Sequence, residues 1–164
     1  MPNAHESGTS RDVVATMGMV SLPNVVVRGG GAEFITQVKT STINPNNKFV
    51  GFQGDFSFDE RVITFQNEPV QKAGITQDNW NVSGNVLPGG GPIRILRVSA
   101  YSNDFVPLSG EGTLFELRVR KVSQSDQSTQ LLWARPPNQF IFIDADLGTH
   151  EPSYEGSGSV VFVP

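Results

Sequence analysis

Apolar and polar residues alternate along most of the chain, and clusters of Gly, Pro, Asn and Ser interrupt the alternation roughly every 8 to 15 residues. A period of two places successive side chains on opposite faces of a β-strand, whereas a helix requires a period near 3.6. No segment keeps a helical apolar stripe over about ten residues. The pattern therefore predicts an all-β protein, built as a sandwich or a barrel.

The segments expected to form strands lie between these clusters. They are Val20–Val27, Phe34–Thr42, Phe49–Asp59, Val62–Gln66, Trp80–Val86, Ile93–Tyr101, Thr113–Val122, Gln130–Trp133, Phe140–Asp144 and Gly158–Val163. The clusters include RGGG and PGGGP, which we interpret as hairpin turns because Gly supplies positive φ angles and Pro fixes φ.

One expected strand is irregular. In Ile93–Tyr101, Ile93 and Ile95 share one face, whereas Leu96 and Val98 share the opposite face. This change of phase predicts a β-bulge near Ile95 or a strand that is covered on both sides.

Length and composition limit the function. A chain of 164 residues is expected to form one domain with a sizeable core, which we place at residues 20–164 after a flexible, polar N-terminal segment at residues 1–19. The net charge of −4 and the lack of a Lys/Arg cluster exclude nucleic acid as a partner. The absence of cysteine excludes disulfides and thiolate metal sites. No apolar run is long enough for membrane insertion.

Four stretches occur in an order that resembles the cohesin domain, over about Val20 to Val163. They are NVVVRGGGAEFITQVKT, GFQGDFSFDERVITFQNEPVQKAG with its aromatic–Asp pair Phe58–Asp59, SGEGTLFELRV, and GSGSVVFV. Cohesins are nine-stranded jelly-roll sandwiches that receive dockerin modules in cellulosomes, with related copies in other bacterial and archaeal surface proteins. The resemblance implies an antiparallel β-sandwich of nine or ten strands with jelly-roll, cohesin-like topology.

The resemblance also implies a binding face. In cohesins the strand before the aromatic–Asp pair lies in the sheet that faces the dockerin, and its outward positions here are Gly51, Gln53, Asp55 and Ser57. The partner-binding residues implied are therefore Gln53, Asp55 and Ser57. Dockerin-binding members usually carry Asn and Asp where this chain has Gly51 and Gln53. The face can thus serve a dockerin-like or another protein partner, or can be solvated without a function.

Four arginines on two expected strands could add to this face. Arg94 and Arg97 lie on one strand, and Arg118 and Arg120 lie on the other. They would form a polar stripe if the two strands were neighbours, but the sequence does not decide which sheet holds them.

The stretch FIDADLGTHEP gathers Asp144, Asp146, His150 and Glu151. Carboxylate oxygens in a Gly-containing loop suit Ca²⁺, but the spacing does not match an EF-hand loop, and we expect a polar connection and no cofactor. No nucleophile accompanies the acids and the histidine, and the sequence contains neither G-x-S-x-G nor H-E-x-x-H. We therefore expect that the chain is not an enzyme.

The function predicted is a non-catalytic protein–protein interaction module of a secreted or cell-surface assembly. One alternative is a carbohydrate-binding module that binds polysaccharide on an exposed platform of Trp80, Tyr101, Trp133 and Tyr154. Another is a structural subunit of a filament or shell, linked by strand exchange through Met1–Asp12 and Val20–Val27.

Overall fold

The computed structural model describes residues 18–164, except for the side chain of Tyr154. Most of the expected flexible segment, and with it Met1–Asp12, lies outside the described residues; the first strand begins at Met19. No helix within residues 18–164 is long and apolar enough to cross a membrane.

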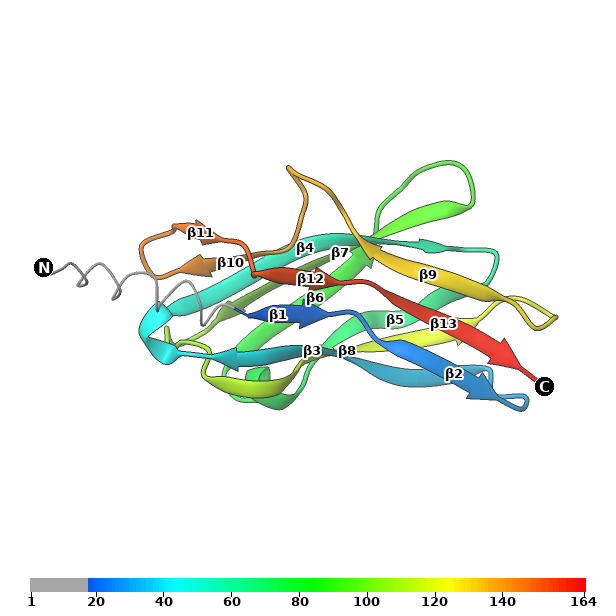
Figure 1. Cartoon of the computed structure of the whole chain (residues 1–164), viewed down its shortest axis with the longest axis horizontal. Helices are drawn as coiled ribbons and strands as arrows, with labels where there is room; N and C mark the ends of the chain where they lie inside the picture. Colours follow the sequence, from blue (N-terminus) through cyan, green and yellow to red (C-terminus); the bar gives the residue numbers. More distant parts are fainter. Residues whose placement is uncertain (1–17) are drawn as a thin grey trace, which may run out of the picture.

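The chain folds into two stacked β-sheets, which confirms the expected all-β sandwich (Figure 1). The five-stranded sheet contains, in order, β12 (Tyr154–Gly156), β1 (Met19–Ser21), β3 (Glu33–Ile43), β8 (Gly110–Lys121) and β5 (Ile63–Lys72). The eight-stranded sheet contains, in order, β11 (Thr149–His150), β10 (Ile141–Asp144), β4 (Phe49–Asp59), β9 (Ser128–Trp133), β13 (Gly158–Val163) and β2 (Asn24–Arg28), while β7 (Ile93–Ser102) pairs with both β4 and β6 (Trp80–Val86). Two 3₁₀ turns, η1 (Pro45–Asn47) and η2 (Gly74–Thr76), complete the described elements.

The core between the sheets is rich in phenylalanine. Phe52, Phe56 and Phe58 of β4 point inward and are almost completely buried. Phe52 stacks on Phe115 of the facing sheet, with ring centroids 5.7 Å apart. Burying a Phe side chain contributes about 1.5–3 kcal/mol, so this alternating face of β4 supplies much of what holds the two layers together.

At each end of the described chain, two consecutive short strands lie in different sheets. This corrects the expectation of a single strand at Val20–Val27. β1 pairs in parallel with β12 in the five-stranded sheet, and β2 pairs in parallel with β13 in the eight-stranded sheet. Between β1 and β2, Leu22 N donates to Gly156 O at 3.0 Å, and Ser159 N donates to Pro23 O at 2.9 Å. Pro23 interrupts the ladder because it has no N–H.

The register of β7 corrects a second expectation. β7 pairs with β4 without a break from Ile93↔Asp59 to Tyr101↔Gly51, so no bulge is present near Ile95. Ile93 instead lies on the outer side of the sheet, where its side chain is 56% exposed. The apolar residues on the two faces of β7 thus reflect a core on one side and a solvent-facing apolar surface on the other.

The two Gly-rich turns differ. PGGGP joins β6 to β7, which pair antiparallel, and is a hairpin turn as expected. RGGG joins β2 to β3, which lie in different sheets, so the hairpin expected there is wrong. In Figure 1 the β6–β7 and β9–β10 connections both project upward beyond the layer that contains β4 and β7.

Candidate functional site

Gln53, Asp55 and Ser57 all lie on the outer side of β4, because the residues between them face inward. On β7 their direct cross-strand neighbours are Ser99, Arg97 and Ile95, respectively. We call this surface, formed by the outward residues of β4 and of its neighbours β7 and β9, the outer face. It carries Gln53, Asp55 and Ser57, the partner-binding residues that the cohesin resemblance implies.

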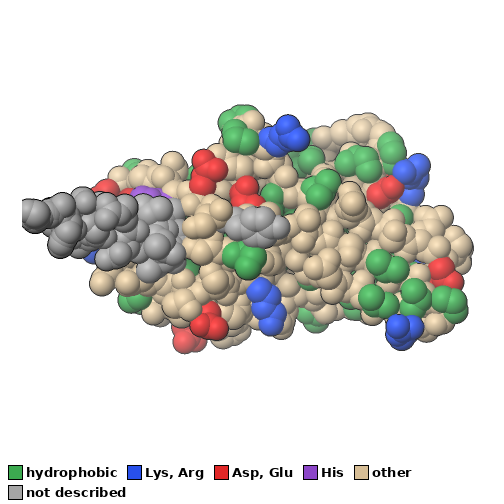
Figure 2. Space-filling model, in the orientation of Figure 1, with side chains coloured by type: hydrophobic (Ala, Val, Ile, Leu, Met, Phe, Trp, Pro, Cys, Tyr) green, Lys and Arg blue, Asp and Glu red, His purple; other side chains and the backbone are tan. Residues whose placement is uncertain are grey.

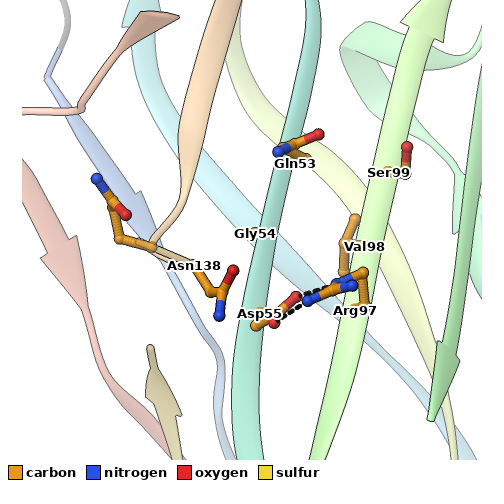
Figure 3. Close-up of a pocket in the computed structure, with 8 residues that line it drawn as sticks. Gln53, Gly54, Asp55, Arg97, Val98, Ser99 and Asn138 are labelled. Carbon is orange, nitrogen blue, oxygen red and sulfur yellow. Dashed lines mark hydrogen bonds and ion pairs between the residues drawn. The ribbon is translucent and has the colours of Figure 1, made fainter. Parts of the chain in front are cut away.

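Asp55 is outward but not accessible, because Arg97 covers it (Figure 3). Arg97 Nε donates to Asp55 Oδ1 at 2.8 Å, and Arg97 Nη2 donates to Oδ2 at 2.9 Å. Asp55 is 4% exposed, whereas 47% of the Arg97 side chain remains exposed. The hydrogen bond to Asp55 also raises the pKa of Arg97. The pair therefore presents the guanidinium N–H groups of Arg97 to solvent in place of the Asp55 carboxylate.

A polar hollow of about 230 Å³ surrounds this ion pair. Figure 3 shows Gln53 and Ser99 on one side of it and Asn138 on the other. Asn138 comes from the β9–β10 connection, where its carbonyl accepts the N–H of Asp55 at 3.1 Å. The hollow offers neutral hydrogen-bonding groups and the unused N–H groups of Arg97.

Gly54 allows the connection to approach β4. A Cβ at Gly54 would lie 2.8 Å from Phe140 Cα, closer than real Cβ atoms come to backbone. The side chain of Gln139 lines the same hollow, and its Oε1 is buried without a hydrogen-bond partner among the described residues.

Apolar side chains lie on the outer face at either side of the polar hollow. Beyond Ser57, a second hollow of about 320 Å³ is lined in part by Ile93 and Leu132, which are 56% and 43% exposed. In the other direction along β4, Tyr101 lies opposite Gly51 and is 54% exposed. From the sequence, Tyr101 was expected only in an aromatic platform, and no role was predicted for Ile93 or Leu132. The signal for the apolar part of the face was that Ile93 and Ile95 share one face of β7 with the polar residues Arg97 and Ser99.

The four arginines do not form one stripe. Arg94 and Arg97 are on β7, while Arg118 and Arg120 are on β8 in the other sheet. Arg94 donates to Glu60, and Arg120 donates to Glu33. Of these four arginines, Arg97 lies on the outer face, because Arg94 stands opposite the inward-facing Phe58 and the other two lie in the other sheet.

The proposed aromatic platform does not assemble from the residues whose side chains are described. Trp80 is 5% exposed and stacks on Phe52 at a centroid distance of 5.9 Å. Trp133 is half-buried and packs edge-on against Phe56. Tyr101 is the exposed aromatic residue among these, at 54%, and a sugar ring would lack the flat tryptophan surface expected from the sequence.

Asp144 organises the β10–β11 hairpin. Its Oδ1 accepts the N–H groups of Asp146 at 2.8 Å and Gly148 at 2.9 Å, and its Oδ2 lies 2.7 Å from His150 Nε2. The hydrogen bond from His150, followed by that from Gly148, lowers the pKa of Asp144. Residues 18–164 bring no three His, Asp or Glu side chains together in a way that could hold a metal ion.

No known protein family's sequence profile matches the chain, and no curated protein matches it. Solved structures do. A cohesin from a type I cohesin–dockerin complex of Clostridium thermocellum is 14% identical, with a TM-score of 0.67 over 88% of this chain and 98% of that one. A non-cellulosomal cohesin from the archaeon Archaeoglobus fulgidus is 16% identical, with a TM-score of 0.62 over 89% of both chains.

A type II cohesin domain from the cellulosome of Acetivibrio cellulolyticus is also similar, with 11% identity and a TM-score of 0.58 over 87% of this chain and 92% of that one. The chain therefore has the cohesin fold, as the resemblance in its sequence implied.

Proposed function

We propose that this chain is a non-catalytic protein–protein interaction module that binds a dockerin-like partner through its outer face. The observation that carries the proposal is the match of nearly the whole chain to cohesins that were solved in complex with dockerins. Because these matches extend over the entire sandwich, they support a module that uses the surface of the fold and not an added domain. A setting in a secreted or cell-surface assembly is part of the proposal, since one similar structure comes from a cellulosome.

The outer face has the layout of a protein interface. Its centre offers the hydrogen-bonding groups of Gln53, Ser99 and Asn138, which would fix the orientation of a partner. Ile93 and Leu132 beside it would supply apolar contact area, the kind of contact that dominates affinity.

The ion pair of Asp55 with Arg97 determines which charge on a partner residue the centre of the outer face would favour. Asp55 is already neutralised within the chain, so a cationic side chain of the partner would meet Arg97 and be repelled. The oxygen atoms of carbonyl, amide and hydroxyl groups would instead accept hydrogen bonds from the remaining guanidinium N–H groups. The partner's central contact residues should therefore be neutral or acidic.

The proposal is tested by calorimetry against a panel of type I and type II dockerin modules. Ile93→Lys should weaken binding by at least about tenfold, because it places a charge in the apolar part of the contact. The matched control is Ile35→Lys on the outer side of the other sheet, where the native isoleucine is 57% exposed against 56% for Ile93. The control should bind like the unmodified chain.

Two outcomes would contradict the proposal. One is equal binding by the Ile93→Lys and Ile35→Lys variants, which would exclude the outer face as the binding site. The other is a chain that binds no dockerin of the panel but binds polysaccharide on a glycan array, which would favour carbohydrate recognition.

A further inference from the structure

β2 has one edge without a strand beside it. β2 pairs with β13 on one side and ends the order of the eight-stranded sheet, and no strand within residues 18–164 pairs with its other side. An open edge presents backbone N–H and C=O groups that can pair with another strand. β2 is therefore a surface onto which a further strand can add.

The side chains of this edge strand are apolar and incompletely buried. Val26 is 56% exposed, and Val25 and Val27 are half-buried against the core. In Figure 2, apolar side chains gather at the end of the molecule where β2 and β13 lie in Figure 1. A strand added at this edge would cover Val26 and complete the burial of its two neighbours.

The sequence of β2 is complementary to itself when two copies run antiparallel. With Val26 opposite Val26 of a second copy, Asn24 faces Arg28 and Val25 faces Val27. No like charges meet in this register. A parallel pairing in register would instead place two Arg28 side chains next to each other.

The residues at both ends of β2 leave room for the second copy. Just before β2, the carbonyl of Pro23 accepts the N–H of Ser159 in β13, so Pro23 pairs on the side away from the open edge. A Cβ added at Gly29 or Gly30 after β2 would meet nothing within 4 Å. The glycines that follow β2 therefore place no side chain beside an added strand.

We propose that the open edge of β2 is a self-association surface, on which β2 of a second copy adds antiparallel about a two-fold axis at Val26. This goes beyond the proposed partner binding, because the edge is separated from β4 by β9 and β13. A single pair of five-residue strands buries little area, so the dimer is weak and depends on protein concentration.

Cross-linking tests the register directly, because the chain contains no cysteine. Val26→Cys would place two thiols across the two-fold axis, within the range that a disulfide spans. Under mild oxidation it should form covalent dimers at least about ten times faster than Ile93→Cys, at equal protein concentration. Ile93 is the matched control because it is also an exposed strand residue, 56% exposed like Val26.

Sedimentation velocity over a concentration series supplies a second readout. Val26→Lys should abolish the dimer, because the symmetry sets two lysines against each other. Asn24→Asp should strengthen it by placing an acid opposite Arg28, and this variant retains the acceptor that Ser159 Oγ uses at 3.1 Å. Circular dichroism establishes that each variant is folded. Equal cross-linking of Val26→Cys and Ile93→Cys, or a chain that remains monomeric up to about 1 mM, would overturn the proposal.

Discussion

At the scale of single residues, the outer face depends on how Asp55 is neutralised. Arg97→Met would leave a carboxylate that is 4% exposed without its counter-ion. We expect the free energy of unfolding to fall by about 1–3 kcal/mol, because a desolvated charge is costly when it is unpaired. Urea denaturation at neutral pH measures the change.

The control is Arg120→Met. Arg120 and Glu33 form an ion pair in which the side chains are 52% and 49% exposed, so its loss should change stability by less than about 0.5 kcal/mol. Equal losses in the two variants would show that Asp55 is not effectively desolvated. Adding Asp55→Asn to Arg97→Met should recover part of the loss, because the remaining amide carries no charge.

For Asp55, the sequence predicts the direction of the side chain but not its accessibility. The alternation in β4 correctly places Asp55 on the side away from Phe56. Its accessibility depends on which β7 residue stands opposite, and no short turn fixes that register, because β5 and β6 lie between β4 and β7 in the sequence. The direction of a side chain was thus predictable, but its availability to a partner was not.

At the scale of elements, the β10–β11 hairpin depends on the ionised form of Asp144. Its pKa is lowered in the folded protein, chiefly by the hydrogen bond from His150. The stabilisation is therefore complete above the unfolded pKa of about 3.9, and it is lost as the pH falls through the lower folded pKa. Asp144→Asn should destabilise the protein at neutral pH, and the difference from the unmodified chain should shrink below about pH 4.

Thermal unfolding at several pH values between about 2.5 and 7 checks this dependence. Asp146→Asn is the matched control, because Asp146 lies in the same hairpin with an exposed side chain. A pH-independent difference for Asp144→Asn would contradict the assigned role of the carboxylate.

The close approach of the two terminal segments, where β1 gives way to β2 and β12 to β13, depends on Gly158. A Cβ at this position would lie 2.1 Å from Pro23 O, so Gly158→Ala requires the two backbones to separate. We expect a loss of about 1–3 kcal/mol in the free energy of unfolding, as for other overpacked sites. Gly30→Ala is the control, because its added Cβ meets nothing and stability should stay unchanged or rise slightly. Equal stability of the two variants would contradict the close approach.

Part of this change between sheets was readable in the sequence. The inward side chains of β1 and the following residue are Val20 and Leu22, whereas those of β2 are Val25 and Val27, so the phase changes at Pro23. A proline within an apparent strand often marks such an interruption. The change from β12 to β13 has no comparable signal, since buried Gly156, Gly158 and Val160 keep one phase. Only the pairing of β12 with β1 separates these two strands.

At the scale of the whole molecule, the alternating pattern specified the sandwich and its phenylalanine core. Phe52, Phe56 and Phe58 lie where the period of two places them, because burial on one face fixes the phase of a strand. The partner could not be predicted in the same way. The proposed binding surface is assembled from β4, β7 and β9, and which strands become neighbours is decided by long-range pairing.

The parallel pairing of β2 with β13 has a mechanical consequence. The chain enters this pair at one end of the two strands and leaves it at the opposite end, so tension between Met19 and Val163 would slide the strands lengthwise (Figure 1). Hydrogen bonds that run across the pull are then strained simultaneously and do not open one after another like a zipper. Stretching of single molecules by these two residues should thus require a larger rupture force than stretching in a direction that peels β2 sideways from its neighbour. Such resistance suits a link that carries load.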